Sequence, residues 1–161
     1  MRKTIYNRVD AVNYARTWAF KRNPNYYNFD NLGGDCTNFV SQCVFAGTKV
    51  MNFTPVFGWY YNHLNDRTPS WSGVEYFHNF LTKNDGLGPV GIIVDLGDIQ
   101  IADVIFLKRF NDDLYHTLFV NDVIDGQIYV SSHTFDAYNR NLYSYNFNKA
   151  VCVHIDSVNI K

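Results

Sequence analysis

The spacing of hydrophobic residues divides the chain into a helical first half and a strand-rich second half. Apolar residues recur at helical intervals and predict three helices, at residues 8–22, 36–46 and 72–82. After Gly88 and Pro89 the pattern predicts five strands, at residues 91–95, 103–109, 115–122, 127–133 and 151–155. This order is typical of an α+β fold in which N-terminal helices pack on an antiparallel sheet. The length of 161 residues suits one domain, residues 1–161.

Local signals predict how the helices begin, end and face the core. The apolar stripe of the first helix consists of Val9, Val12, Ala15 and Ala19. Gly47 is expected just past the end of the second helix. Ser72 and Glu75 fit a capping box at the start of the third. Residues 51–71 have no periodic pattern and predict an aromatic-rich loop.

Composition removes several classes of function. A formal net charge of −1 gives no field for nucleic acid, and only the short segment KRNPNYY mixes basic and aromatic residues, so no nucleic-acid partner is expected. Three cysteines make an odd count without a disulfide framework, and no zinc-type spacing is present, so no metal or cofactor is expected. The N-terminus lacks the apolar run of a signal peptide and no segment is long enough to span a bilayer. We expect a soluble domain, either cytoplasmic or part of a longer secreted protein.

The segment GGDCTNFVSQC, residues 33–43, carries the strongest chemical signal. Gly33 and Gly34 permit tight backbone geometry just before the second helix, so Cys36 falls in its first turn. The free N–H groups at a helix N-terminus favour an anion and lower the pKa of a cysteine there, which would make Cys36 a nucleophile. The alternatives are a small buried core residue, as expected for Cys43, or a metal ligand together with His116 and His133.

Two histidines on neighbouring strands could assist such a nucleophile. If Asp125 and Gly126 form a two-residue hairpin turn, His133 is a diagonal neighbour of His116 on the same face of the sheet. His116 would then be the general base, within reach of the Cys36 sulfur, and His133 would hold its tautomer. A slip of one residue in register would put the two histidines on opposite faces. The rival orienting residues are Asn121, Asp122, Ser131 and Ser132. The histidines expected to be structural are His63, His78 and His154.

Four segments carry a resemblance to a known family. They are DCTNFVSQ (35–42), IADVIFL (101–107), YHTLFVND (115–122) and IYVSSHTFD (128–136). The chain resembles the putative amidase domain family, bacterial papain-like cysteine hydrolases related to the NlpC type. The resemblance implies a papain-like α+β fold with Cys36 as nucleophile, His116 as base and His133 as orienting residue. Asp35 matches the acidic residue before the cysteine. The chain departs at Ala102, where the family usually has glycine.

Two functions follow from this resemblance. The first is a cysteine amidase or peptidase acting on a peptide or cell-wall amide, with the Cys36 backbone N–H and a neighbouring donor stabilising the oxyanion. Four aromatic residues could line its groove or simply pack in the core: Trp59, Tyr60, Tyr61 and Trp71. The second is a catalytically inactive module of the same fold that binds peptidoglycan or a partner protein through the aromatic loop. The sequence does not predict the oligomeric state.

Overall fold

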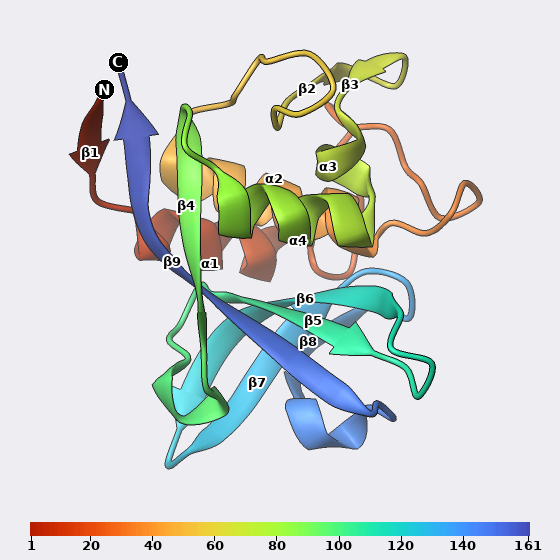
Figure 1. The fold of residues 1–161 in the computed structure, drawn as a ribbon. Coiled ribbons are helices and arrows are strands. Elements are labelled where there is room, and N and C mark those ends of the chain that lie inside the picture. Colours follow the sequence, from red (N-terminus) through yellow and green to blue (C-terminus); the bar gives the residue numbers. More distant parts are fainter.

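The helices lie in the first half of the chain and the strands mainly in the second (Figure 1). A computed structural model of residues 1–161 gives these bounds. The helices are α1 (Arg8–Trp18), α2 (Cys36–Thr48), α3 (Pro69–Ser72) and α4 (Val74–Lys83). The strands are β1 (Arg2–Thr4), β2 (Tyr61–His63), β3 (Asp66–Arg67), β4 (Gly88–Val94), β5 (Val104–Lys108), β6 (Leu114–Ile124), β7 (Gln127–Ser132), β8 (Ala137–Asn141) and β9 (Lys149–Ile160). The predicted α+β class is confirmed.

Seven of the strands form one antiparallel sheet around the long strand β9. Its order is β1-β9-β5-β6-β7-β8, and β4 pairs with β9 as well. β9 runs diagonally across Figure 1 and brings the C-terminus beside β1. All five predicted strands are present. The sequence pattern missed β1, β8 and the small β2–β3 hairpin, which are short and mostly polar.

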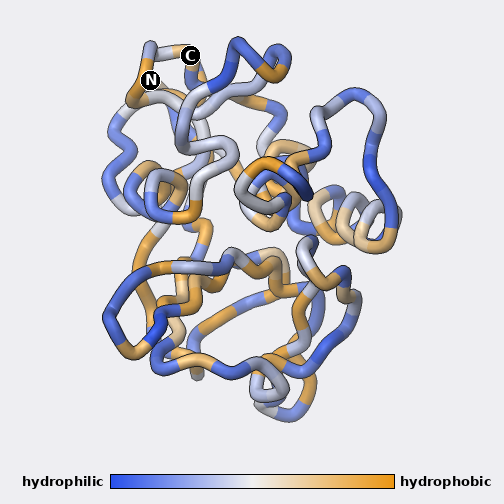
Figure 2. The backbone as a smooth tube through the Cα atoms, turned by 90° about the vertical axis from the view of Figure 1, so that its right-hand side faces the viewer, coloured by the Kyte–Doolittle hydropathy of each residue, from blue (hydrophilic) through white to orange (hydrophobic).

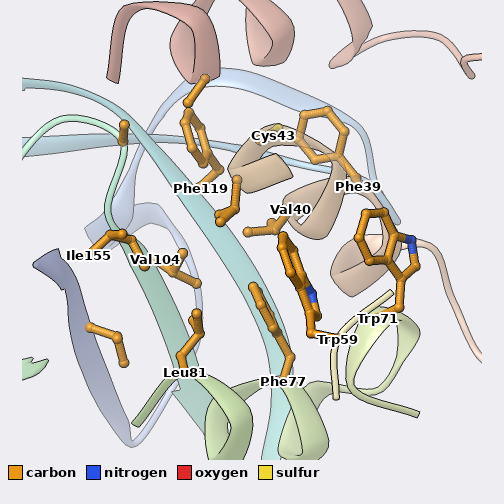
Figure 3. Packing of buried hydrophobic residues seen from close by; sticks show 14 of the residues in the cluster. Phe39, Val40, Cys43, Trp59, Trp71, Phe77, Leu81, Val104, Phe119 and Ile155 are labelled. Atoms are coloured by element: carbon orange, nitrogen blue, oxygen red, sulfur yellow. The ribbon is translucent and has the colours of Figure 1, made fainter. Parts of the chain in front are cut away.

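Two apolar clusters cover the two faces of this sheet. The larger lies between the helices and the sheet, where Phe39 and Val40 of α2 meet Phe77 of α4 and Phe119 of β6 (Figure 3). The smaller lies on the other face and is built around Leu107, Leu118 and Val130. In Figure 2, apolar stretches alternate with hydrophilic ones along the backbone in the lower half of the molecule. The sheet is therefore buried on both sides, and its inner strands have little polar alternation.

The helices differ in detail from their sequence signals. α1 ends at Trp18, and its buried side is Ala11 and Ala15, whereas Val9 is 69% exposed, so the predicted stripe was wrong there. Gly47 lies inside α2 rather than beyond it. Glycine is needed there because a side chain would collide with the Tyr6 ring and the Asn7 carbonyl oxygen.

The third predicted helix is two helices, and its predicted cap is absent. Ser72 belongs to the short α3, and its hydroxyl accepts a hydrogen bond from Arg67 instead of capping α4. None of the helices has the length and apolar character needed to cross a bilayer.

Candidate active site

Cys36 opens α2 at the point where the chain turns in from a glycine-containing loop. Gly33 and Gly34 have φ values of 85° and 97°, a region that L side chains rarely adopt. Asp35 occupies the N-cap position but makes no side-chain cap, so the first-turn N–H groups of α2 have no carboxylate on them. The predicted position of Cys36 in the first turn is confirmed, with its side chain 7% exposed.

The Cys36 sulfur is surrounded by two threonines. The Thr37 and Thr117 hydroxyls are 2.7 Å apart, which joins the first turn of α2 to strand β6, and Sγ lies 3.8 Å from the Thr37 hydroxyl. Burial raises the pKa of the Cys36 thiol above its ordinary value. Hydrogen bonds from Thr117 and Thr37 favour the thiolate and lower the pKa, but by less than burial raises it. The expected lowering of this pKa by the helix N-terminus is therefore wrong in direction, because loss of water outweighs the donors.

Asp35 and His133 form a buried pair beneath Cys36. Each side chain is 1% exposed, and His133 Nδ1 lies 2.5 Å from Asp35 Oδ2. The other carboxylate oxygen accepts hydrogen bonds from the Phe29 backbone N–H and the Asn38 amide. His133 Nε2 donates to the Trp18 carbonyl oxygen at 2.8 Å. Both nitrogens of His133 thus face acceptors, so this histidine holds Asp35 and α1 rather than another imidazole.

The role expected for His133 as the partner of His116 is wrong, because of a slip in register. Near the hairpin turn the pairing is as predicted, with Ile124 opposite Gln127. The register shifts between Val120 and Asp122, so the next pair is Val120 with Val130. One extra residue on β6 reverses which face each later side chain occupies. His133 therefore faces the helices and stacks on Phe39, with ring centroids 4.1 Å apart.

Ser132 takes the place expected for His133. Its hydroxyl lies 3.0 Å from His116 Nε2 and donates to the His133 carbonyl oxygen at 2.7 Å. A hydroxyl has one hydrogen, so it must accept from His116, which places the imidazole proton on Nε2 and leaves Nδ1 with a free lone pair. Burial, together with the positive charge of Arg140, lowers the pKa of His116 to about 4. His116 is therefore a neutral imidazole at pH 7.

Cys36 and His116 are neighbours through Thr117 but are not hydrogen bonded. Thr117 packs against the sulfur, while its neighbour His116 points to the opposite side of β6, as consecutive strand residues do. The His116 ring lies between those of Tyr115 and Tyr145, with centroids 6.1 and 5.8 Å away. The expected contact between the sulfur and the imidazole is thus not formed.

The other rival orienting residues lie away from the imidazole. Asn121, at the bulge, accepts the Ser131 hydroxyl and donates to Asn139. Asp122 bonds the backbone N–H of Val123. The sequence predicted Ser132 only as one of four candidate orienting residues. Nothing in the sequence marked Thr37 and Thr117 as part of the site, apart from their positions next to Cys36 and His116.

The aromatic residues expected to line a groove are mostly core residues. Trp59 and Trp71 are fully buried and Tyr61 is 8% exposed (Figure 3). The two indole N–H groups donate to Ser41 and Asn38 on α2. Tyr60 alone is half-buried, and its hydroxyl donates to Asp66. The two tryptophans therefore pack against α2 and hold it by hydrogen bonds, and they do not line a groove.

The three cysteines should differ in reactivity. Cys36 is expected to react with iodoacetamide before Cys152, and Cys43 last, because exposure falls from 7% through 2% to 0% in that order. Burial raises the pKa of all three thiols, that of Cys43 well above its ordinary value and that of Cys152 to about 11, while only Cys36 has hydroxyl donors. Peptide mapping over pH 7–10 would measure this, and earlier labelling of Cys43 or Cys152 would contradict it.

Comparisons with known proteins give one family and two relatives. The family described as "Putative amidase domain" matches residues 5–155, which include Cys36 and His116. The uncharacterized protein YjcM of Bacillus subtilis is 26% identical over 137 residues, covering 80% of this chain and 31% of YjcM. The uncharacterized protein YhbB of the same organism is 48% identical over 50 residues, covering 31% of this chain and 15% of YhbB. The chain thus spans a third or less of these relatives. No solved structure matches it.

Proposed function

Because the chain belongs to the putative amidase domain family, we propose that it hydrolyses amide or peptide bonds with Cys36 as nucleophile and His116 as general base. The observation that supports this most is the hydrogen bonding between His116 and Ser132. Ser132 fixes the proton on Nε2, so Nδ1 is a base on the strand whose next residue touches the Cys36 sulfur. We infer a papain-like arrangement within one domain: a helix that starts with cysteine, packed on an antiparallel sheet that carries the histidine.

The two groups start the reaction as a neutral pair. The pKa of Cys36 is raised and that of His116 is lowered, so thiol and imidazole are both uncharged at pH 7. His116 Nδ1 takes the thiol proton as the sulfur attacks the amide carbonyl, and the imidazolium then protonates the amine as the C–N bond breaks. Water hydrolyses the resulting thioester. Because the imidazole and the sulfur lie on opposite sides of β6, the first transfer requires a rearrangement of this end of β6 that brings Nδ1 to the sulfur.

The first turn of α2 supplies the stabilisation of the oxyanion. The Asp35 carboxylate is directed to His133, Phe29 and Asn38, so it does not occupy the N–H groups of Cys36 and Thr37. An uncapped helix N-terminus can donate to the negative oxygen of a tetrahedral intermediate. Asp35 therefore acts by shaping this turn, not by touching the substrate.

A substrate screen tests the proposal. Wild-type protein incubated with short peptides and cell-wall muropeptides is expected to release a new amine, detected by mass spectrometry, and Cys36→Ala should release none. A thioester adduct on Cys36 in quenched samples would identify the nucleophile. Turnover by Cys36→Ala equal to that of wild type would end the proposal.

A binding module of the same fold is the second candidate, favoured by the missing hydrogen bond between Cys36 and His116. It predicts that wild type and Cys36→Ala bind cell-wall fragments equally well, and that neither cleaves them.

A further inference from the structure

The turn between β7 and β8 holds a conformation that its residues disfavour. Thr134 and Phe135 have φ values of 61° and 59°, in the left-handed region. Hairpin turns with two such residues are normally built from asparagine, aspartate or glycine. A β-branched residue followed by a bulky aromatic one is strained there, and such strain persists only where the surroundings impose it.

The surroundings are the loop that carries Cys36. His133 bonds the Asp35 carboxylate, and the Thr134 hydroxyl accepts the Asp35 backbone N–H at 3.1 Å. Asp136 is paired with Arg22, whose guanidinium also binds Asp30 on the same loop. Three of the four turn residues therefore hold the nucleophile's loop. On the preceding strand, Ser132 holds His116. The turn lies between the two halves of the active site.

Phe135 is the one turn residue without such a contact. Its side chain is 89% exposed, although the ring is large and apolar and the backbone position would suit asparagine better. On the facing loop Leu32, three residues before Asp35, is 54% exposed. The two segments meet where the Asp35 backbone N–H bonds Thr134, so Phe135 lies one residue, and Leu32 three residues, along the chain from this hydrogen bond beside Cys36.

We propose that Phe135, together with Leu32, binds an apolar side chain of the substrate next to the scissile amide. The preferred substrates are then peptides or acyl groups with a leucine-like or aromatic residue beside the bond that is cleaved. This rests on the proposed function for the role of Cys36. An exposed ring gains most from burial against such a side chain, and a contact of this kind discriminates by about 10–200-fold.

Covalent labelling tests the contact without requiring turnover. Two chloromethyl ketones, acetyl-alanyl-leucyl and acetyl-alanyl-glycyl, alkylate Cys36 as the sulfur displaces chloride, and intact mass spectrometry gives the rates. We expect the leucyl probe to react about tenfold faster with wild type. Phe135→Asn should abolish most of this preference. It should leave the iodoacetamide rate unchanged and the melting temperature equal or higher, because asparagine tolerates the turn conformation.

The control is Phe57→Asn, which removes a ring of similar exposure, 84%, on the loop after the far end of α2. It should keep the leucyl preference. An unchanged preference in Phe135→Asn, an equal loss in Phe57→Asn, or no preference in wild type would overturn the proposal. A matching fall in the iodoacetamide rate would show that Phe135 only supports Cys36, which also overturns it. Failure to hydrolyse any amide would leave this labelling result intact.

Discussion

Replacing His116 with alanine is expected to lower kcat/KM by about 10²–10⁴-fold, the usual contribution of a general base. The imidazole is held by Ser132 with its proton on Nε2, and the side chains that contact the Cys36 sulfur are threonine hydroxyls, which are not bases. The thiol is the protonated form at neutral pH because burial raises its pKa, so the reaction depends on a group that removes the proton. The measurement is steady-state turnover of whichever substrate the screen identifies.

The pH profile supplies an independent check on the same residue. Because the pKa of His116 is lowered to about 4, kcat/KM should rise with pH through about 4 as the base loses its proton, and then stay high toward neutrality. His78→Ala is the matched control, since this half-buried histidine lies on α4 against Phe106. Full activity in His116→Ala, or an acidic limb near the ordinary histidine pKa, would assign the base to another group.

The position of Cys36 was predictable because it depends on local geometry. Two glycines with positive φ before a helical pattern place Cys36 in the first turn whatever the rest of the chain does. The helical and strand periods likewise predicted most elements. The backbone conformation of Ala102, in contrast, was not predicted from the sequence pattern. This residue has a φ of 72°, so the glycine usual in the family fits a left-handed residue, and alanine here carries some strain.

The orienting residue was not predictable because it depends on one bulge. No local signal places an extra residue at Asn121, whose side-chain oxygen accepts the Ser131 hydroxyl and the Asn139 N–H. Because of that extra residue, Ser132 lies beside His116 in the position predicted for His133. The two alternatives for the aromatic loop, groove or core, could not be separated for a similar reason. Trp59 and Trp71 find their partners on α2, far away in sequence, and nothing local distinguishes such a ring from one in a groove.

Replacing His133 with alanine is expected to lower the free energy of unfolding by about 3–5 kcal/mol, as when one partner of a buried charged pair is removed. Asp35 would lose its closest partner while staying 1% exposed, and the stack on Phe39 and the bond to the Trp18 carbonyl would go as well. Chemical denaturation measures this.

The matched control is His154→Ala, and the decisive variant is a double one. His154 also pairs with a buried carboxylate, Asp103, but that group keeps Arg8 at 2.7 Å, so the expected loss is smaller. In a His133→Ala background, Asp35→Asn should cost less than it does in wild type, because the carboxylate has then lost its closest partner and keeps only Arg22, at 3.5 Å. A coupling of about 1–3 kcal/mol is expected. Additive effects, or a loss no larger than in His154→Ala, would contradict a charged pair. Since His133 bonds Asp35 and not His116, the properly folded fraction of His133→Ala should retain the acidic limb of kcat/KM that His116 sets.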